Sequence, residues 1–369
     1  MKLERIFLQN YANYESQDYA TDRMLNVLVG ENAQGKTNLL DAIYYLSRGS
    51  SGRYGRDADI IRWGNGFFRL RALVRSHEMT RDITISYTQG KKAVSVDGNA
   101  LRSNAQLMGV FNTVLFSPDD LAMVKGSPER RRKYLDDELM QTDPTYYGDV
   151  YRYRKILQQR NNVLKKIRAG QKEEHLLDVL DEQLAGVGMS LTRRRMDMAE
   201  RIRPLARLVQ RRMTAGEEEL DIEYLCSSRR QPRNKGETIC EETFLELLKE
   251  SRAEDVGRGF TGYGPHRDDL MTLINGADAR ISGSQGQQRT VALSLKIAEI
   301  EFLKAQTGEV PVLLLDDVLS ELDGGRRKKL LETVSDNIQT FITCTELEHL
   351  DPQLIGRAAV SRIRQGKVE

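Results

Sequence analysis

The chain has few cysteines, no C-x-x-C pair and no long apolar run. Its three cysteines, Cys226, Cys240 and Cys344, lie far apart, which argues against a zinc site and for a reducing compartment. No stretch approaches the roughly 20 apolar residues that a membrane-spanning helix needs. Residues 1–6 include the charged side chains of Lys2, Glu4 and Arg5, where a signal peptide would require an apolar core. We therefore expect a cytoplasmic protein with no membrane partner.

Net charge is also small. The chain has 56 Lys and Arg against 54 Asp and Glu, a balance of +2, so a surface for nucleic acid must come from local clustering. With 369 residues, 39% hydrophobic and 30% charged, the chain is long enough for two domains or for one large domain with an insertion.

Residues 30–37 fit the P-loop pattern G-x-x-x-x-G-K-[ST]. They are Gly30, Glu31, Asn32, Ala33, Gln34, Gly35, Lys36 and Thr37. The apolar run 25–29 predicts a buried strand before the loop, and the spacing over 38–46 predicts a helix after it. Such a loop holds phosphate with backbone N–H groups. We expect Lys36 to reach the outer phosphates and Thr37 to bind Mg²⁺. A chance glycine-rich turn is the competing interpretation, and it does not account for the two correct flanks.

Two carboxylates end an apolar run near the other end of the chain. Residues 311–315 predict a buried strand that delivers Asp316 and Asp317 at its carboxyl end. We expect Asp316 to hold Mg²⁺, directly or through water, and Asp317 to orient the attacking water as a general base. The alternative is an edge strand that meets a polar loop. Residues 339–345 predict one more core strand.

A helix preceded by small and hydroxyl residues begins near Ser284. Ser284, Gly286 and Gln287 lie where its N-terminus would offer a second anion-binding site, in a chain with one P-loop. In the glycine-rich segment 258–269, His266 has two interpretations, a structural residue or part of a site lining.

Other residues near the P-loop are open to two interpretations each. Tyr11, Asn13 and Tyr14 either border the nucleotide base or, for the tyrosines, are half-buried sheet residues. Arg53 and Arg56 belong to a Ser/Gly/Arg-rich segment that either contacts DNA phosphates or is a solvated loop.

Three further features give simpler predictions. The single Trp63 is expected in the core or at its edge. Alternating apolar residues over 67–97 predict a small β meander, with turn residues at 89–92 and 97–99. Ser127 is a candidate helix N-cap, followed by Pro128.

Residues 129–215 differ from the preceding segments in their spacing of apolar residues and in their charge. Apolar residues at a 3-4 stagger, with a break near 169–171, predict two long helices in an antiparallel, coiled-coil-like arm. Two basic runs lie on it. The first contains Arg152, Arg154, Lys155, Arg160, Lys165, Lys166 and Arg168, and the second runs from Arg193 to Arg212 with Asp197 and Glu200 as its acids. Such runs are usually solvated faces, but two on one arm make DNA-backbone binding an equal alternative, with Arg152 and Arg154 as candidates.

Together these motifs resemble the ABC-type ATPases of chromosome maintenance, with Walker A first, Walker B last and a helical arm between. The chain is similar to the RecF family of bacterial recombination mediators. The matching segments are FSPDDL at 116–121, VKGSP at 124–128, GPHRDD at 264–269 and SQGQQR at 284–289. The resemblance covers nearly the whole chain.

The resemblance implies an α/β fold with an ABC-type P-loop ATPase lobe and an inserted helical lobe. The ATPase lobe, with a mixed sheet and an antiparallel β meander, would comprise residues 1–125 and 258–369, and the coiled-coil-like lobe residues 126–257. It implies ATP and Mg²⁺ as cofactors, slow hydrolysis, and an ATP-driven homodimer in which the P-loop of one subunit and Ser284 of the other enclose each nucleotide. It also implies binding of double-stranded and gapped DNA in repair, replication and the SOS response, with RecR and RecO as partners in loading the recombinase.

The chain departs from the family pattern at several positions. Ala12 stands where RecF proteins tend to carry arginine. Asp317 replaces the glutamate of most ABC ATPases, which fits slow turnover. Thr343 or Thr345 stands near the place of the transporters' switch histidine. The Q-loop glutamine has no clear counterpart, and the nearest residues are at 117 and 119.

Three other functions remain open from the sequence. The nucleotide-binding subunit of a transporter shares the core motifs but would not explain the basic arm. A GTPase or small-molecule kinase is suggested by the NKGE tetrapeptide at 234–237, although it ends in Glu and does not follow a core strand. The last alternative is a scaffold that binds ATP without hydrolysing it.

Overall fold

The structure is a computed structural model that describes residues 1–21, 23–228, 240–333 and 337–369. The described residues form two compact units, one made of residues 1–120 with 296–369 and the other of residues 121–295. Residues 258–295, which the resemblance places in the ATPase lobe, group with the helical unit here. The functional division into lobes remains a prediction.

A largely parallel sheet forms the centre of the first unit. Its strands are β3 (Leu25–Val29), β8 (Thr113–Phe116), β12 (Val312–Leu315), β13 (Thr340–Cys344), β14 (Ala359–Arg364) and β15 (Lys367–Val368). The order is β15-β14-β3-β13-β12-β8, and the β14–β15 pair is antiparallel. Strands β12 and β13 are buried along their whole length, as in parallel strands covered on both faces. The carboxyl ends of β3, β13 and β12 therefore meet at one edge, where open α/β sheets bind ligands.

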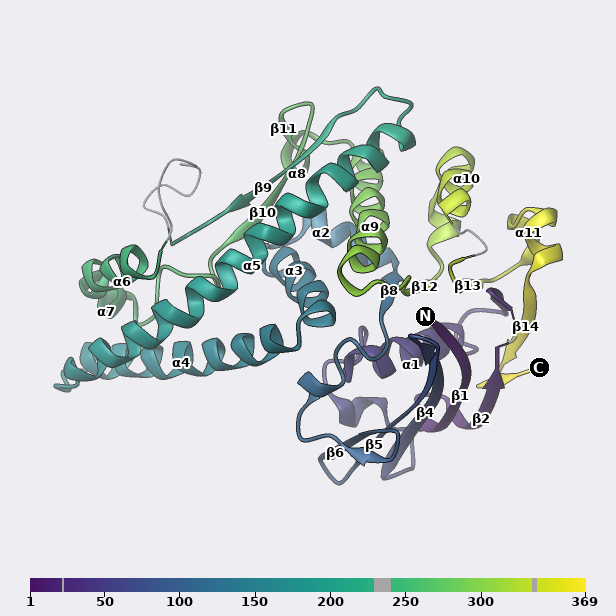
Figure 1. Ribbon diagram of the computed structural model, residues 1–369, viewed down its shortest axis with the longest axis horizontal. Coiled ribbons are helices and arrows are strands. Elements are labelled where there is room, and N and C mark those ends of the chain that lie inside the picture. Colours follow the sequence, from purple (N-terminus) through teal and green to yellow (C-terminus); the bar gives the residue numbers. More distant parts are fainter. Residues whose placement is uncertain (22, 229–239, 334–336) are drawn as a thin grey trace. The chain divides into compact units, whose positions relative to one another are not determined.

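An antiparallel sheet forms a second layer of this unit. Its strands are β1 (Lys2–Tyr11), β2 (Tyr14–Ala20), β4 (Phe67–Ser76), β5 (Met79–Thr88), β6 (Lys91–Val96) and β7 (Asn99–Ala100). The order is β2-β1-β4-β5-β6-β7, and Figure 1 labels the first five of these strands. Buried and exposed residues alternate along β4, so one face packs inward. The meander predicted over 67–97 is confirmed by the β4–β5–β6 pairings.

Helix α1 (Lys36–Arg48) contacts strands of both sheets of the first unit: β1, β4 and β5 in the antiparallel sheet, and β8 and β13 in the parallel sheet. From Leu39 onward its residues are buried, because apolar surface on either side of the helix is covered. The P-loop therefore leads into a helix that is fixed from two sides. Helices α10 (Gly324–Thr333) and α11 (Pro352–Arg357) also belong to this unit, as does the part of α9 (Gln285–Thr307) from Lys296 onward.

The second unit is mostly helical. Its elements are α2 (Ala122–Lys125), α3 (Pro128–Thr142), α4 (Pro144–Arg168), α5 (His175–Met213), β9 (Leu220–Leu225), α6 (Glu241–Glu250), α7 (Arg252–Arg258), β10 (Asp269–Ile274), β11 (Ala277–Asp278), α8 (Ala279–Ser282) and the start of α9 (Gln285–Thr307). Helices α4 and α5 pack side by side as the predicted antiparallel pair (Figure 1). The predicted break lies between them, where Gly170 has φ of 90°. The sheet β11-β10-β9 is not predicted by the sequence pattern.

One local prediction is wrong, and a second is confirmed in position only. Trp63 is 80% exposed and not in the core, because it lies in a turn before β4, after the buried Ile60. Ser127 occupies the N-cap position of α3 as predicted, but its side chain makes no capping hydrogen bond. In the described residues, none of the helices is both long and apolar enough to span a membrane.

Candidate nucleotide-binding site

The P-loop connects β3 to α1 by a path that only glycine permits at two positions. Gly35 has φ of 118°, in the left-handed region that side chains disfavour. A Cβ on it would lie 2.7 Å from the amide of Asn13. A Cβ on Gly30 would lie 2.4 Å from the carbonyl oxygen of Ile363 in β14. The neighbouring strands therefore press on the loop and fix its curvature.

Lys36 opens α1 and its side chain turns back along the loop. Its Nζ donates hydrogen bonds to the carbonyl oxygens of Gly30 (2.5 Å) and Glu31 (2.8 Å). Burial lowers the pKa of Lys36, and the nearby carboxylate of Asp317 acts in the opposite direction. The ammonium group thus lies against the loop, at the position expected of a phosphate-binding lysine.

Thr37 and Asp316 come from opposite ends of the sequence and meet directly. The Thr37 hydroxyl donates to Asp316 Oδ1 at 2.9 Å, and the Thr343 hydroxyl donates to the same oxygen at 2.9 Å. Burial raises the pKa of Asp316, and the negative charge of Asp317 adds to the effect. A hydroxyl and a carboxylate are the oxygen donors that Mg²⁺ takes from proteins when phosphates and water complete its shell. In the described part of the chain no cluster of three or more His, Cys, Asp or Glu side chains could hold a metal alone.

Asp317 has an unusual backbone. Its φ is 53°, which is rare for a residue with a side chain and marks local strain. Its N–H donates to Thr343 Oγ1 at 2.8 Å, and its carbonyl oxygen accepts from Ser320 Oγ at 2.7 Å. Thr343 therefore ties both aspartates to the end of β13. The strained turn brings Asp317 to the wall of a hollow beside the P-loop.

This hollow has a volume of about 300 Å³. It is lined by Asn32, Ala33, Gly35, Lys36, Thr37, Asn38, Arg53, Tyr54, Asp317 and Thr343. The structure thus unites residues that the two halves of the sequence supply. Arg53, a candidate for DNA contact from the sequence, lines this hollow, whereas Arg56 forms an ion pair with Asp59. Of the two threonines considered for the switch position, Thr343 lines the hollow. Residues 117 and 119 are not among its described lining residues.

The turn between β1 and β2 supports the P-loop. Asn13 Nδ2 donates to Gln34 O at 2.9 Å, and the Tyr14 hydroxyl donates to Gly35 O at 3.0 Å. Tyr14 is nevertheless buried, as is Tyr11, whose ring packs edge-on against Phe68. For both tyrosines the interpretation as sheet residues is therefore the better one.

The segment around Ser284 belongs to the second unit, where it caps α9. Ser284 N donates to Gln287 Oε1 at 2.8 Å, and Gln287 N donates to Ser284 Oγ at 3.2 Å. This reciprocal pair is a capping box. Both side chains are exposed or half-buried, so the N-terminus of a 23-residue helix is open to a ligand of negative charge.

Comparison with known proteins identifies the family. A family model described as "RecF/RecN/SMC N terminal domain" matches residues 2–354. The "DNA replication and repair protein RecF" of Heliobacterium modesticaldum is 42% identical over 370 residues, and the match covers all of this chain and 99% of that protein. The chain belongs to the RecF family.

Solved structures agree with this assignment. One described as "Structure of the recombination mediator protein RecF-ATP in RecFOR pathway" is 38% identical, with a TM-score of 0.91 over all of this chain and 96% of that chain. An SMC head bound to the C-terminal winged-helix domain of ScpA is 15% identical with a TM-score of 0.58, covering all of this chain and 96% of that one. The second likeness shows the fold alone. The predicted RecF resemblance and α/β fold class with a helical insertion are confirmed.

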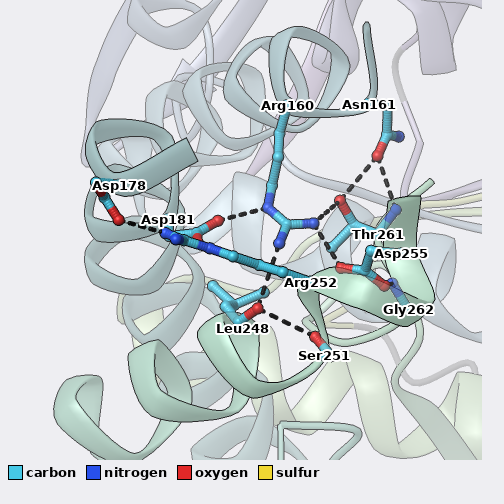
Figure 2. Close-up of polar contacts among 10 residues, drawn as sticks. All are labelled: Arg160, Asn161, Asp178, Asp181, Leu248, Ser251, Arg252, Asp255, Thr261 and Gly262. Atoms are coloured by element: carbon cyan, nitrogen blue, oxygen red, sulfur yellow. Dashed lines mark hydrogen bonds and ion pairs between the residues drawn. The ribbon is translucent and has the colours of Figure 1, made fainter. Parts of the chain in front are cut away.

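The basic runs on the arm of this RecF-family chain are less uniform than the sequence suggests. Arg160 is fully buried and not part of a charged surface. Its guanidinium bonds to Asp181 (2.6 Å), Asp255 (2.7 Å) and the Thr261 hydroxyl (2.8 Å), as Figure 2 shows. Arg195 is likewise buried and bonds to Asp136.

The surface of α4 keeps the charge that the sequence predicts. Arg152 and Arg154 are exposed, and the Arg154 guanidinium lies 4.0 Å from the carboxylate of Asp136. Tyr151 beside them is 70% exposed. An exposed aromatic ring among arginines is the composition of many nucleic-acid surfaces, so these positions remain candidates.

His266 has a structural role in the second unit. Its Nε2 lies 3.1 Å from the carbonyl oxygen of Thr261, and its Nδ1 lies 2.7 Å from the Tyr153 hydroxyl. A carbonyl only accepts, so Nε2 carries the proton and Nδ1 accepts from Tyr153. Burial lowers the pKa of His266 to about 4. The NKGE tetrapeptide at 234–237 lies outside the described residues.

Proposed function

We propose that this chain is an ATP-dependent DNA-binding protein of recombinational repair and replication, and that slow Mg²⁺-dependent ATP hydrolysis resets it. The observation that carries the proposal is the meeting of Lys36, Thr37 and Asp317 around one hollow, with Asp316 hydrogen-bonded to Thr37. Support also comes from the RecF family, in which a solved relative is described as bound to ATP and as a recombination mediator. The cytoplasm is the expected location.

The Walker A and Walker B residues at the hollow have separate roles in the proposed chemistry. The backbone of residues 30–37, with the N-terminus of α1, cradles the phosphates, and Lys36 exchanges its contacts to Gly30 and Glu31 for phosphate oxygens. Thr37 and Asp316 would hold Mg²⁺, which neutralises charge on the phosphates. Asp317 orients the attacking water. Because Asp is shorter than Glu, its reach is limited, and slow turnover is expected.

A homodimer would complete the site. The second anion-binding position, at Ser284, Gly286 and Gln287, opens α9 in the second unit, so an ATP enclosed between two copies would use both positions. Ser284→Arg should abolish ATP-dependent dimerisation, seen by gel filtration, and leave ATP binding intact. Normal dimerisation of Ser284→Arg with ATP would refute the shared site.

DNA is the proposed partner of the assembled dimer, especially duplex beside a single-stranded gap. The exposed face of α4 offers Arg152 and Arg154 for phosphate contacts, and Arg56 is a further candidate on the first unit. Replacing Arg152 and Arg154 by Ala should lower the slope of log affinity against log salt by about two, one for each lost phosphate contact. Lys36→Met should remove the nucleotide dependence of DNA binding.

RecR and RecO are the proposed protein partners, and loading of the recombinase is the proposed outcome. The support is the RecF relative whose description places it in the RecFOR pathway. The most informative single experiment is gel filtration of Asp317→Asn with gapped DNA, with and without ATP. We expect this variant to bind ATP, to dimerise and to hold DNA without turnover. A monomer under all conditions would count against the mechanism.

A further inference from the structure

Trp63 has no role in the ATP site, and its side chain is 80% exposed. It lies in a tight turn beside the end of β1, in which Asn65 N donates to Arg62 O at 3.0 Å and Arg62 N donates to Asn10 O at 2.9 Å. A Cβ on Gly64 would have no described atom within 4 Å beyond its chain neighbours, so the turn projects into solvent. One exposed apolar side chain alone needs no explanation. The surroundings of Trp63 therefore decide whether it has a role.

The turn leads directly into β4, at one end of the antiparallel sheet. Along β4 the exposed Phe67 and Arg69 alternate with buried residues, so both side chains point to the outer face of this sheet. Phe67 pairs with Thr88, and Thr88 pairs with Lys91. Residues directly opposite one another share a face, so these three form the row nearest the turn. The next row consists of Ser16, Gln9, Arg69, Ser86 and Ala93.

The charged side chains in these two rows are both positive. Arg69 and Lys91 are exposed, and neither forms an ion pair with a carboxylate in the part of the chain that the structure describes. Other arginines of this sheet and its turns are paired, Arg5 with Asp18, Arg62 with Glu15, Arg71 with Asp82, Arg75 with Glu4 and Arg81 with Asp97. The two unpaired cations thus lie at the end of the sheet that carries Trp63 and Phe67. We call these four residues the aromatic patch.

The composition of the aromatic patch suits single-stranded nucleic acid. Aromatic rings stack on bases whatever the base, and cations beside them hold the phosphates. Duplex DNA keeps its bases stacked on one another, so it offers a protein phosphates and base edges but not base faces. An unpaired nucleotide offers both a flat ring and a negative charge.

We propose that Trp63 stacks on an unpaired base of DNA and that Arg69 and Lys91 contact the phosphates beside that base. The inference rests on the DNA-binding function proposed above and names the part of the DNA that the aromatic patch takes. Arg152 and Arg154 are candidates for phosphate contacts, which do not distinguish a gap from intact duplex by its bases. Stacking on Trp63 would supply that distinction.

The fluorescence of Trp63 tests stacking directly, because it is the only tryptophan of the chain. The full chain with ATP and Mg²⁺ is titrated with three DNAs that differ only in the middle. One has a gap of unpaired thymidines, the second has the same gap with abasic residues, and the third is intact duplex. We expect quenching of the indole emission by the thymidine gap alone. The anisotropy of a dye on the DNA reports binding of all three independently.

Affinity for the same three DNAs gives a second readout. Trp63→Ala should weaken binding of the thymidine gap by about tenfold and leave the other two affinities unchanged, whereas Trp63→Phe keeps a ring and should lose less. Arg69→Ala combined with Lys91→Ala should weaken both gapped DNAs, because both retain phosphates, and should lower the slope of log affinity against log salt by about 1.4. Met79→Ala is the matched control, since Met79 is 61% exposed at the other end of β5 from Thr88. It should change none of the three affinities.

Several results would overturn the proposal. A bound thymidine gap that does not quench Trp63, or an abasic gap that quenches it equally, would mean that no base stacks on the ring. Equal loss of affinity for all three DNAs in Trp63→Ala would mean a general structural effect. Loss of ATP-dependent dimerisation in Trp63→Ala, seen by gel filtration, would assign the aromatic patch to a contact between two copies. Duplex binding that still depends on Arg152 and Arg154 would then leave the proposed DNA-binding function standing, whereas no binding of any of the three DNAs would end both.

Discussion

Acidification should destabilise this protein through one buried histidine. His266 accepts from Tyr153 and donates to Thr261 O, and burial lowers its pKa to about 4 from an ordinary 6.5. Unfolding exposes the ring and restores the ordinary pKa. Between these two values the unfolded chain binds more protons than the folded chain, so the free energy of unfolding falls as pH falls.

The size of the effect follows from the difference between the pKa values of His266 in the folded and the unfolded chain. At about 1.4 kcal/mol per pKa unit, the full difference lowers the free energy of unfolding by about 3 kcal/mol. From pH 7.5 to pH 5.0 only part of it has developed, about 2 kcal/mol. The loss begins near the ordinary pKa and is complete below the folded one, since both states are then protonated.

A matched variant isolates this contribution from the other titrating groups. In His266→Gln the amide can donate to Thr261 O and accept from Tyr153, as the neutral ring does, but it does not titrate. We would measure unfolding by urea at pH 7.5 and pH 5.0 for both proteins. The parent chain should lose about 2 kcal/mol more than the variant over this interval. Equal losses of unfolding free energy in the two proteins would refute the claim that His266 is buried in its neutral form.

Three further predictions test other parts of the structure. Arg160→Ala leaves buried carboxylates without their main partner and should lower the free energy of unfolding by about 3–5 kcal/mol, whereas Lys165→Ala on the exposed face of α4 should change it by less than about 0.5 kcal/mol. Thr343→Val keeps the side-chain shape but removes the hydroxyl that bonds both Asp316 and the N–H of Asp317. It should slow ATP hydrolysis more than tenfold with little change in ATP affinity, measured by phosphate release and calorimetry. The single Trp63 should fluoresce at the wavelength of a solvated indole and be quenched by acrylamide, because it is 80% exposed.

Motifs whose chemistry is local could be predicted well from the sequence. The strand, loop and helix around Lys36 and the strand that ends at Asp316 each depend on a few adjacent residues, so pattern and spacing suffice. Their direct contact follows from parallel strands that end at one edge of a sheet. The sequence gives no comparable signal for Arg53 in the hollow, because the path of its turn depends on a hydrogen bond to Asp41.

Trp63 is a residue whose burial was predicted wrongly from the sequence. Large aromatic residues are usually buried at least in part, and that expectation led to the wrong placement. The residue is followed by Gly-Asn-Gly, a run that favours a turn. Turn chemistry therefore outweighed hydrophobicity at this position, and the buried apolar contact of the segment is made by Ile60.

The arm shows why charge runs must be examined by helical position. On α4 the buried stripe includes Tyr153, and Arg160 follows it by seven residues, the spacing at which a side chain returns to the same face. On α5 the buried stripe runs through Leu177, Asp181 and Leu184 at steps of four and three. The arginine and the aspartate thus stand at inward positions of facing helices and form an ion pair at 2.6 Å. A polar pair at such positions fixes how two helices align, because sliding one helix would leave both charges unpaired in the interior. The opposite charges at inward positions therefore indicate how α4 and α5 are aligned. Arg152 and Arg154 lie outside the buried stripe and face solvent.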